Sequence, residues 1–247
     1  MNYYRMVIAY DGTAYAGWQE QPDQPTVSGK LSSVFASIFD APVLIQAASR
    51  TDAGVHALGQ VVCARTIRTV EPKLLTRVWN GRLPSDILIR NITCMSPGYD
   101  PRDNVNFKTY YYHLFPQRPL PFAARYGWYY RYPLNYAKLT ECLSVFSGTH
   151  DFRAFCTGTE MGPNTVRTIN EIGYEKIRRF GVTRIYVKGP GFMKYMVRRI
   201  VGACVQVASS DTPVSYIHEI LHARSPEHTL VKAPAHGLML HSIAYRT

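Results

Sequence analysis

The sequence has little of what marks membrane or secreted proteins. No apolar run approaches the ~20 residues that a membrane-spanning helix needs, so an integral membrane protein is not expected. The first residues lead straight into a strand-like run, without the order of charged, apolar and small residues typical of a signal peptide. The five cysteines form no C-x-x-C pair and are odd in number, which predicts reduced thiols. These absences predict a cytoplasmic protein.

Acidic residues are scarce relative to basic ones. The chain has 28 Lys and Arg against 17 Asp and Glu, a formal net charge of +11. Such an excess favours a polyanionic partner, with nucleic acid first and an anionic membrane surface second. A merely basic soluble protein is the third interpretation. The 18 tyrosines favour nucleic acid, because aromatic rings among cations suit unstacked bases.

The length of 247 residues allows one or two domains. Strands are expected at residues 3–10, 42–47, 60–66, 87–94, 107–115, 167–177, 182–188 and 237–245. Helices are expected at residues 26–39, 71–80, 135–146, 192–209 and 213–224. This order predicts an α+β protein of two halves, residues 1–105 and 106–247, each with a mostly antiparallel sheet flanked by helices. The boundary falls in residues 96–106, which are rich in Pro, Gly, Asp and Asn.

A polar turn between two predicted strands is the first candidate site. Residues 49–57 read Ser-Arg-Thr-Asp-Ala-Gly-Val-His-Ala and place Arg50 two residues before Asp52. An arginine beside a carboxyl group lowers the pKa of that group and keeps it ionised. An ionised carboxylate suits a nucleophile or an electrostatic group better than a general acid. The alternative is a salt bridge that caps a surface turn.

This turn resembles the G-R-T-D-A-G-V-H-A signature of the TruA-type tRNA pseudouridine synthases. Eight of the nine positions match, and Ser49 stands where the family usually has glycine. Four further segments resemble family motifs in the same order: Tyr10–Gln19, Trp79–Ile87, Met196–Gly202 and Pro234–Tyr245. The resemblance therefore spans nearly the whole chain.

The resemblance implies roles for four residues. Asp52 matches the catalytic aspartate of the family, and Tyr110 matches the active-site tyrosine that packs on the target uracil. Arg198 matches the basic residue that pairs with the aspartate, and Arg50 matches an arginine that helps to hold the flipped nucleotide. These residues imply a two-part site, with the aspartate in the N-terminal half and the tyrosine and Arg198 in the C-terminal half.

The resemblance also implies the reaction and the partners. The family isomerises uridine to pseudouridine at tRNA positions 38 to 40 in the anticodon stem-loop, as a homodimer, without metal or cofactor. The two halves are expected to face each other across a basic RNA-binding cleft. The uridine must be flipped out of the stack before its N1–C1′ bond is exchanged for a C5–C1′ bond. The residues do not decide between three mechanisms: attack at C1′, attack at the uracil ring, and an elimination route. Thr109 and Tyr111 depart from the basic residues that often flank the family tyrosine.

A basic segment of the C-terminal half is the expected RNA-facing surface. Residues 176–199 contain eight basic residues, interleaved aromatic residues and no acid. Binding to a nucleic-acid backbone needs such a stripe. Residues 125–131 either extend this pattern or belong to a partly buried sheet. The alternative for residues 176–199 is a solvated helix face.

Two other functions remain as alternatives. The first is a catalytically silent RNA-binding protein. The second is a zinc metalloprotease, because His218-Glu219-Ile220-Leu221-His222 is an H-E-x-x-H motif and His228 lies where a third zinc ligand would fall. Two features oppose it: the two motif histidines lie on the flank of the helix's apolar stripe, and the residue before Pro226 is driven out of helical conformation. In the pseudouridine synthase interpretation this segment is a surface helix.

Overall fold

The computed structural model describes residues 1–39, 43–156, 164–223 and 231–246. The chain forms two compact units, one of residues 1–106 with 239–247 and one of residues 107–238. The closing strand was expected in the C-terminal half, but residues 239–246 belong to the first unit. Within the described ranges, no helix is long and apolar enough to cross a membrane.

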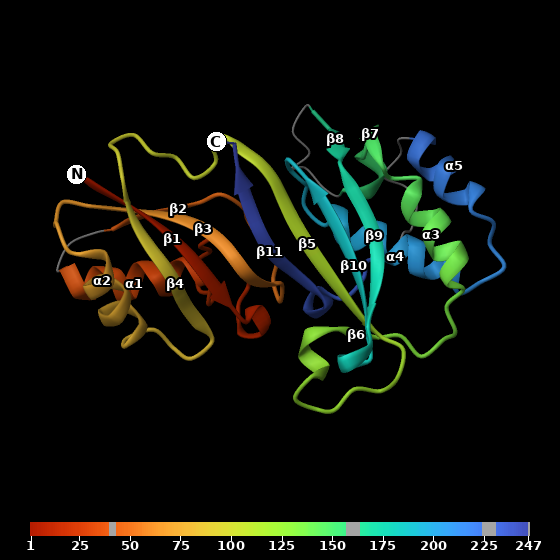
Figure 1. The fold of residues 1–247 in the computed structure, drawn as a ribbon, viewed down its shortest axis with the longest axis horizontal. Helices are drawn as coiled ribbons and strands as arrows, with labels where there is room; N and C mark the ends of the chain where they lie inside the picture. Colours follow the sequence, from red (N-terminus) through yellow and green to blue (C-terminus); the bar gives the residue numbers. More distant parts are fainter. Residues whose placement is uncertain (40–42, 157–163, 224–230, 247) are drawn as a thin grey trace. The chain divides into compact units, whose positions relative to one another are not determined.

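The first unit is built around strand β1 (Asn2–Tyr10), which has an antiparallel partner on each side. The other strands of this unit are β2 (Leu44–Ala47), β3 (His56–Thr66), β4 (Ile87–Met95) and β11 (Leu238–Tyr245). Strand β1 lies between β3 and β4 and is antiparallel to both (Figure 1). The C-terminal part of β3, residues 62–65, pairs with β2, whereas its first two residues pair in parallel with β11. Every second residue of β1 is buried from Tyr4 to Tyr10, so one face of this sheet is covered by the core.

Two helices close the core of the first unit. Helix α2 (Pro72–Asn80) begins where sequence rules predict, because the Glu71 carboxylate accepts bonds from the backbone N–H groups of Lys73 and Leu74. The fully buried Trp79 ring stacks on Phe35 of α1 (Val27–Phe39), with ring centroids 3.7 Å apart. The two helices therefore lie side by side (Figure 1).

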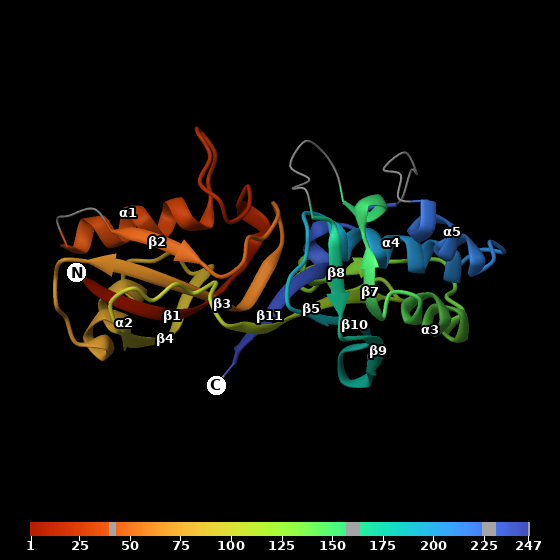
Figure 2. The ribbon, with the colours of Figure 1, turned by 90° about the horizontal axis from the view of Figure 1, so that it is seen from above.

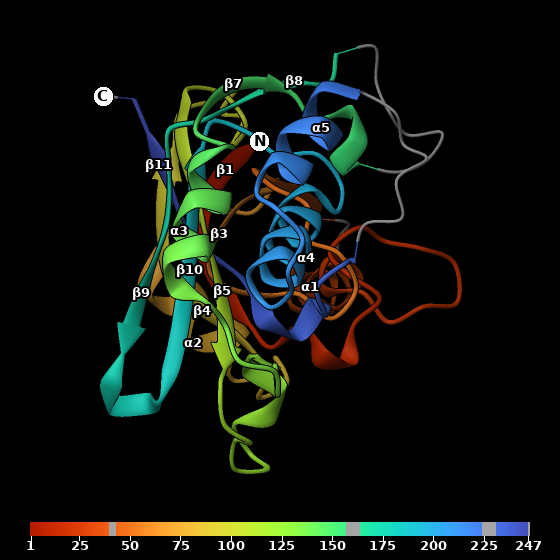
Figure 3. The ribbon, with the colours of Figure 1, turned by 90° about the vertical axis from the view of Figure 1, so that its right-hand side faces the viewer.

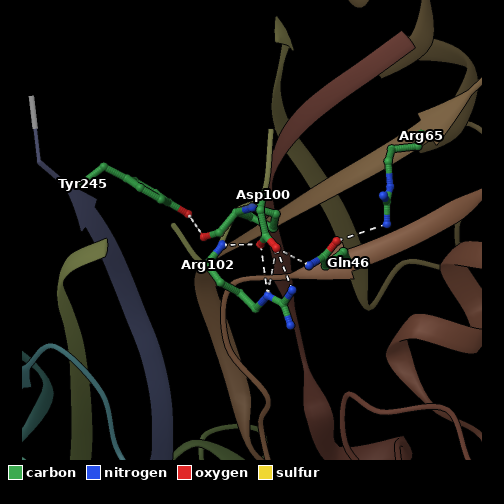
Figure 4. A network of polar contacts seen from close by, with 6 residues as sticks. Gln46, Arg65, Asp100, Arg102 and Tyr245 are labelled. Carbon is green, nitrogen blue, oxygen red and sulfur yellow. Dashed lines mark hydrogen bonds and ion pairs between the residues drawn. The ribbon is translucent and has the colours of Figure 1, made fainter. Parts of the chain in front are cut away.

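A polar network ties the segment after β4 to the sheet of the first unit (Figure 4). The Asp100 carboxylate accepts bonds from the Arg102 guanidinium at 2.6 Å and from Gln46 Nε2 at 2.7 Å. Arg65 Nη2 donates to Gln46 Oε1 at 3.1 Å, and Tyr245 OH donates to the Pro101 carbonyl at 2.7 Å. Hydrogen bonds from Arg102 are the main cause that lowers the pKa of Asp100 to about 2. The network thereby holds β2, β3 and β11 to one short loop.

We expect Asp100→Asn to destabilise the protein at neutral pH and to have less effect in acid. The folded pKa of Asp100 lies below the ordinary value near 3.9, so its contribution is present above about pH 4 and is lost as pH falls toward 2. Because the Arg102 side chain is 63% exposed, solvent screens the pair, and we expect a loss of about 1 kcal/mol. Urea unfolding at pH 7 and pH 3 measures it, with exposed Asp211→Asn as control. If Asp100→Asn lowered the unfolding free energy by the same amount at pH 7 and at pH 3, the result would contradict this role.

The second unit places three helices against a sheet. Strand β10 (Val182–Gly189) lies between β5 (Val105–Phe115) and β9 (Glu171–Ile177), antiparallel to both. Its residues alternate between partly exposed and buried, as in a sheet with one covered face. Helices α3 (Tyr136–Ser144), α4 (Met196–Ala208) and α5 (Ser215–Ala223) group on one side of these strands (Figure 2; Figure 3). The predicted α+β class and the mostly antiparallel pairing are confirmed.

Three local features differ from the expectation. The strand expected at 167–177 is two strands: β8 (Val166–Ile169) pairs with β7 (Gly148–Asp151) in a separate sheet, while β9 pairs with β10. The chain changes partner at Asn170, whose N–H donates to the Lys188 carbonyl. Helix α4 begins at Met196 and not at 192, because Tyr195 has a left-handed φ of 63°. Strand β6 (Trp128–Tyr129) is too short to leave an alternation pattern.

Candidate active site

Asp52 is half-buried in the turn between β2 and β3, and a buried residue lies on each side of this turn. Thr51 on one side is 8% exposed and Val55 on the other is 2% exposed. The Thr51 hydroxyl shares a buried hydrogen bond of 2.7 Å with Tyr10 OH, and the Val55 N–H donates to the Asp52 carbonyl at 3.1 Å. Gly54 supplies the left-handed φ of 74° that the turn needs. The backbone of this turn is thus fixed on both sides of the carboxylate.

The segment after β1 lies directly against the same turn. The Trp18 N–H donates to the Thr51 carbonyl at 3.0 Å, and the Gly54 N–H donates to the Tyr15 carbonyl at 3.2 Å. Gly17 has φ 105°, and a Cβ there would lie 2.8 Å from the Thr51 carbonyl oxygen. Only glycine allows this close approach. The two motifs that the sequence shows far apart, at residues 10–19 and 49–57, therefore form one structural element.

Asp11, Gly12 and His56 make a second contact between these motifs. His56 is 2% exposed, and its Nδ1 lies 3.1 Å from the Gly12 nitrogen and 3.1 Å from Asp11 Oδ1. An unprotonated Nδ1 accepts the Gly12 N–H, whereas a protonated Nδ1 donates to Asp11. His56 was not among the candidate residues expected from the sequence. Its buried position indicates that it anchors the C-terminal side of the Asp52 turn.

We expect Gly12→Ala to destabilise the first unit and to displace the Asp52 turn. A Cβ at Gly12 would overlap the Val55 carbonyl group, which is backbone and cannot rotate away. Overpacking of this kind costs about 1–3 kcal/mol of unfolding free energy. A displacement of about 1 Å at the carboxylate would lower turnover roughly 100-fold. Chemical unfolding and a turnover assay measure the two effects.

Gly191→Ala is the matched control, because a Cβ there meets nothing within 4 Å. Its unfolding free energy should stay within about 0.5 kcal/mol of the wild type. Equal stability and turnover of the two alanine variants would show that the close approach at Gly12 does not hold the turn.

Arg50 and Ser49 precede the carboxylate on the same turn. Arg50 is exposed, so its guanidinium is accessible to a ligand. The Ser49 carbonyl accepts a bond from Gln60 Nε2 at 2.7 Å. Because β3 residue Gln60 holds the backbone of Ser49, the exchange of the usual glycine for serine leaves this part of the turn attached to the sheet.

Tyr110 lies on β5 in the second unit. It is 6% exposed, pairs with Val187 of β10, and its ring meets the Phe192 ring edge to face at 5.4 Å between centroids. Lys108 and Tyr112 lie two residues away on the same face of the strand, by the period of two. Burial lowers the pKa of Lys108. Neither Lys108 nor Tyr112 was among the candidate residues; the alternation along β5 is the signal that links them to Tyr110.

Arg198 lies in the first turns of α4 and is 8% exposed. Its Nε donates to the Ala233 carbonyl at 2.9 Å, and the Ala233 N–H donates back to the Arg198 carbonyl at 3.1 Å. Tyr112 OH donates to the next carbonyl, that of Pro234, at 2.9 Å. Burial raises the pKa of Tyr112, against the opposing effect of the Arg198 charge. Residues 233–234 thus position Arg198 close to the face of β5 that carries Tyr110.

The basic segment 176–199 is not one uniform surface. Lys188 forms an ion pair with Glu171 at 2.6 Å, and Arg184 forms one with Glu175 at 2.9 Å. Arg199 donates to the Cys156 carbonyl at 3.0 Å. Two of the eight charges are therefore paired across the β9–β10 hairpin, while Arg178 and Arg179 at its tip are exposed.

The H-E-x-x-H segment forms the exposed side of α5. Ile217, Ile220 and Leu221 are buried, whereas the histidines point away from them. The His222 Nδ1 donates to the His218 carbonyl at 2.7 Å. Among the residues that the structure describes, no group of three or more His, Cys, Asp or Glu could hold a metal ion. His228 lies outside the described residues. The prediction of a surface helix is confirmed.

The sequence matches the model of the tRNA pseudouridine synthase family over residues 6–98 and 143–246. The tRNA pseudouridine synthase A of Pseudothermotoga lettingae is 34% identical over 99% of this chain and 100% of its own. That of Thermodesulfovibrio yellowstonii is 32% identical over 98% of each chain. A solved Cbf5-Nop10-Gar1 complex matches at TM-score 0.35 and 11% identity, over 82% of this chain and 44% of that one.

The chain belongs to the tRNA pseudouridine synthase family, and it is therefore an enzyme of the isomerase class. The four residues that the resemblance implied divide between the two units. Asp52 and Arg50 share one turn of the first unit, and Tyr110 and Arg198 lie in the second unit.

Proposed function

We propose that this enzyme converts uridine to pseudouridine at positions 38 to 40 in the anticodon stem-loop of tRNA, with Asp52 as the catalytic carboxylate. The observation that carries the proposal is the fixed Asp52 turn, which the 10–19 motif braces through Gly17 and Trp18. A carboxylate on a rigid backbone is held in a defined position for attack or for charge stabilisation. Its relatives are named for tRNA pseudouridine synthesis.

The reaction is an isomerisation and needs no net electron transfer. The N1–C1′ bond breaks, the uracil turns, C5 bonds to C1′, and the C5 proton is lost as N1 gains one. An ionised Asp52 attacks C1′ or the uracil ring, or assists an elimination, and all three routes use its negative charge. The uridine must first leave the base stack, which favours an unpaired or weakly paired target.

The second unit supplies the groups that receive the flipped base. The Tyr110 ring is braced by Phe192 and offers a π-face for stacking on uracil. We propose that Arg198 pairs with the Asp52 carboxylate and that Arg50 holds the flipped nucleotide. We also propose that the enzyme is a cytoplasmic homodimer with a basic RNA-binding surface. The formal charge of +11 supports RNA binding.

Tritium release tests the function directly. Uridine labelled at C5 in tRNA loses its tritium when C5 bonds to C1′, so the purified protein should release tritium with and without a chelator. A protein that binds tRNA without releasing tritium would be the silent RNA-binding protein. Release that stops with the chelator and returns with zinc would instead show a metal-dependent reaction. Mapping the product within the anticodon stem-loop checks the three proposed positions.

We expect Tyr110→Phe and Tyr110→Ala to behave differently. Phenylalanine keeps the stacking face, whereas alanine loses it at a cost of about 1–3 kcal/mol per stacked base. If the hydroxyl relays the C5 proton, Tyr110→Phe accumulates a rearranged intermediate that keeps its tritium. Single-turnover pseudouridine formation and tritium release separate the two roles. An unchanged rate in both variants would remove Tyr110 from the site.

A further inference from the structure

One end of the sheet in the second unit carries exposed arginine and aromatic side chains. Strand β5 ends at this edge and β10 begins there, because Leu114 pairs with Thr183. Residues 116–127 and 178–181 therefore leave the sheet at the same end and project from the unit (Figure 1; Figure 3). Residues 130–132 follow β6, which runs parallel to β5 toward that end. We call this the sheet-end surface; it comprises Arg118, Arg125, Arg131, Arg178, Arg179 and Phe180, all exposed.

All charged residues of the sheet-end surface are positive. The sequence contains no Asp or Glu at residues 104–140 and none at residues 176–210. The Arg131 Nη2 donates to Tyr132 OH at 2.7 Å, and the Arg179 guanidinium lies 5.6 Å from the centre of the Phe180 ring. Both contacts orient a guanidinium without neutralising it. The sheet-end surface therefore attracts a polyanion.

The hairpin tip presents an aromatic ring among these charges. The turn of residues 178–181 closes through Gly181 at a left-handed φ of 60°. Phe180 is 67% exposed, and Phe122 on the neighbouring loop is 74% exposed. An exposed phenylalanine that directly follows two arginines matches a nucleotide, since the ring accepts a stacked base and the arginines contact phosphates.

We propose that the sheet-end surface is a second RNA contact, at which an unpaired base of the tRNA stacks on Phe180. The proposal rests on tRNA being the substrate. It adds a site outside the one that holds the reacting uridine, because Tyr110 lies five residues before Phe115 on β5, a span of about 16 Å. A second copy of this chain is a poor occupant: a twofold interface places the same surface on itself and would set arginines against arginines.

The test measures tRNA affinity and chemistry separately. Phe180→Ala should weaken tRNA binding about tenfold. Phe180→Trp keeps the π-face and should bind like wild type, whereas Phe180→Leu keeps the apolar character alone and should bind like the alanine variant. Arg178→Gln with Arg179→Gln should lower the slope of log affinity against log salt by about 1.5–2. Arg68→Gln with Arg77→Gln removes two exposed arginines from the first unit and should leave the affinity nearly unchanged.

Single-turnover pseudouridine formation at saturating tRNA should be the same in wild type and Phe180→Ala, because the reacting uridine does not contact Phe180. Wild-type affinity in Phe180→Ala and in the double arginine variant would overturn the proposal. Sedimentation without tRNA checks the oligomeric state of these variants. A loss of dimer mass that accounts for the weaker tRNA binding would also overturn the proposal, because a second copy of the chain would then cover this surface. Failure of the wild-type enzyme to form pseudouridine would instead contradict the proposed function, and the two results are distinguishable.

Discussion

Replacing Asp52 with asparagine is expected to abolish pseudouridine formation while the fold and tRNA binding persist. The exchange keeps the side-chain volume and removes the charge, and Asx side chains of either kind suit such turns. The backbone bonds of Trp18 to Thr51 and of Gly54 to Tyr15 do not involve the carboxylate, so the turn should stay in place. A neutral amide can neither attack the nucleoside nor stabilise positive charge at C1′. We expect turnover to fall by at least about 10⁴-fold.

The decisive comparison sets tRNA affinity beside single-turnover pseudouridine formation for wild type and Asp52→Asn. Binding should persist or tighten slightly, because one negative charge has left a surface that meets phosphates. Pseudouridine formation at a comparable rate would make Asp52 structural. Joint loss of binding, activity and fold would show that Asp52 contributes through the stability of the turn and not through its charge.

Arg198→Ala is expected to give the second largest effect, a fall in turnover of about 10²–10³-fold. Under the proposed pairing, the Arg198 guanidinium orients and stabilises the ionised Asp52 carboxylate, and alanine removes that charge. Arg198→Lys keeps the positive charge and should retain more of the turnover than Arg198→Ala. Single-turnover rates of pseudouridine formation for wild type and both variants measure the difference.

Arg198→Ala needs a stability control, because the arginine is buried and hydrogen-bonded. Arg198 is 8% exposed and its Nε bonds to the Ala233 carbonyl, so the alanine variant also loses about 1 kcal/mol of unfolding free energy. Chemical unfolding of both Arg198 variants separates this loss from catalysis. Unchanged turnover in a folded Arg198→Ala protein would remove Arg198 from the site.

Local sequence patterns determined most of the secondary structure and located the turn that carries Asp52. Alternation in β1 and β10, and the Glu71 cap with Pro72 in α2, are properties of neighbouring residues and can be read without the fold. Residues 49–57 form a turn whose glycine requirement is local, at Gly54. The sequence therefore identified Asp52, Tyr110 and Arg198 as candidates through their motifs.

Tertiary structure decided which distant segments support those residues. The contacts of Gly12 and Gly17 with the Asp52 turn, and of residues 233–234 with Arg198 and Tyr112, join segments that no local pattern connects. The return of β11 to the first unit likewise depends on its pairing with β3. Such choices rest on packing between elements, which a single sequence does not encode in its local periodicity.

The basic segment 176–199 shows most clearly what the sequence determined and what it could not. The sequence by itself fixed the number and sign of its charges, and hence the preference for a polyanion. Only the register of the β9–β10 pair, which sets Lys188 opposite Glu171 and Arg184 opposite Glu175, decided which charges are neutralised. The physical reason is that an ion pair forms only between groups a few ångströms apart in space. The strand register, and not the separation along the chain, brings these groups that close.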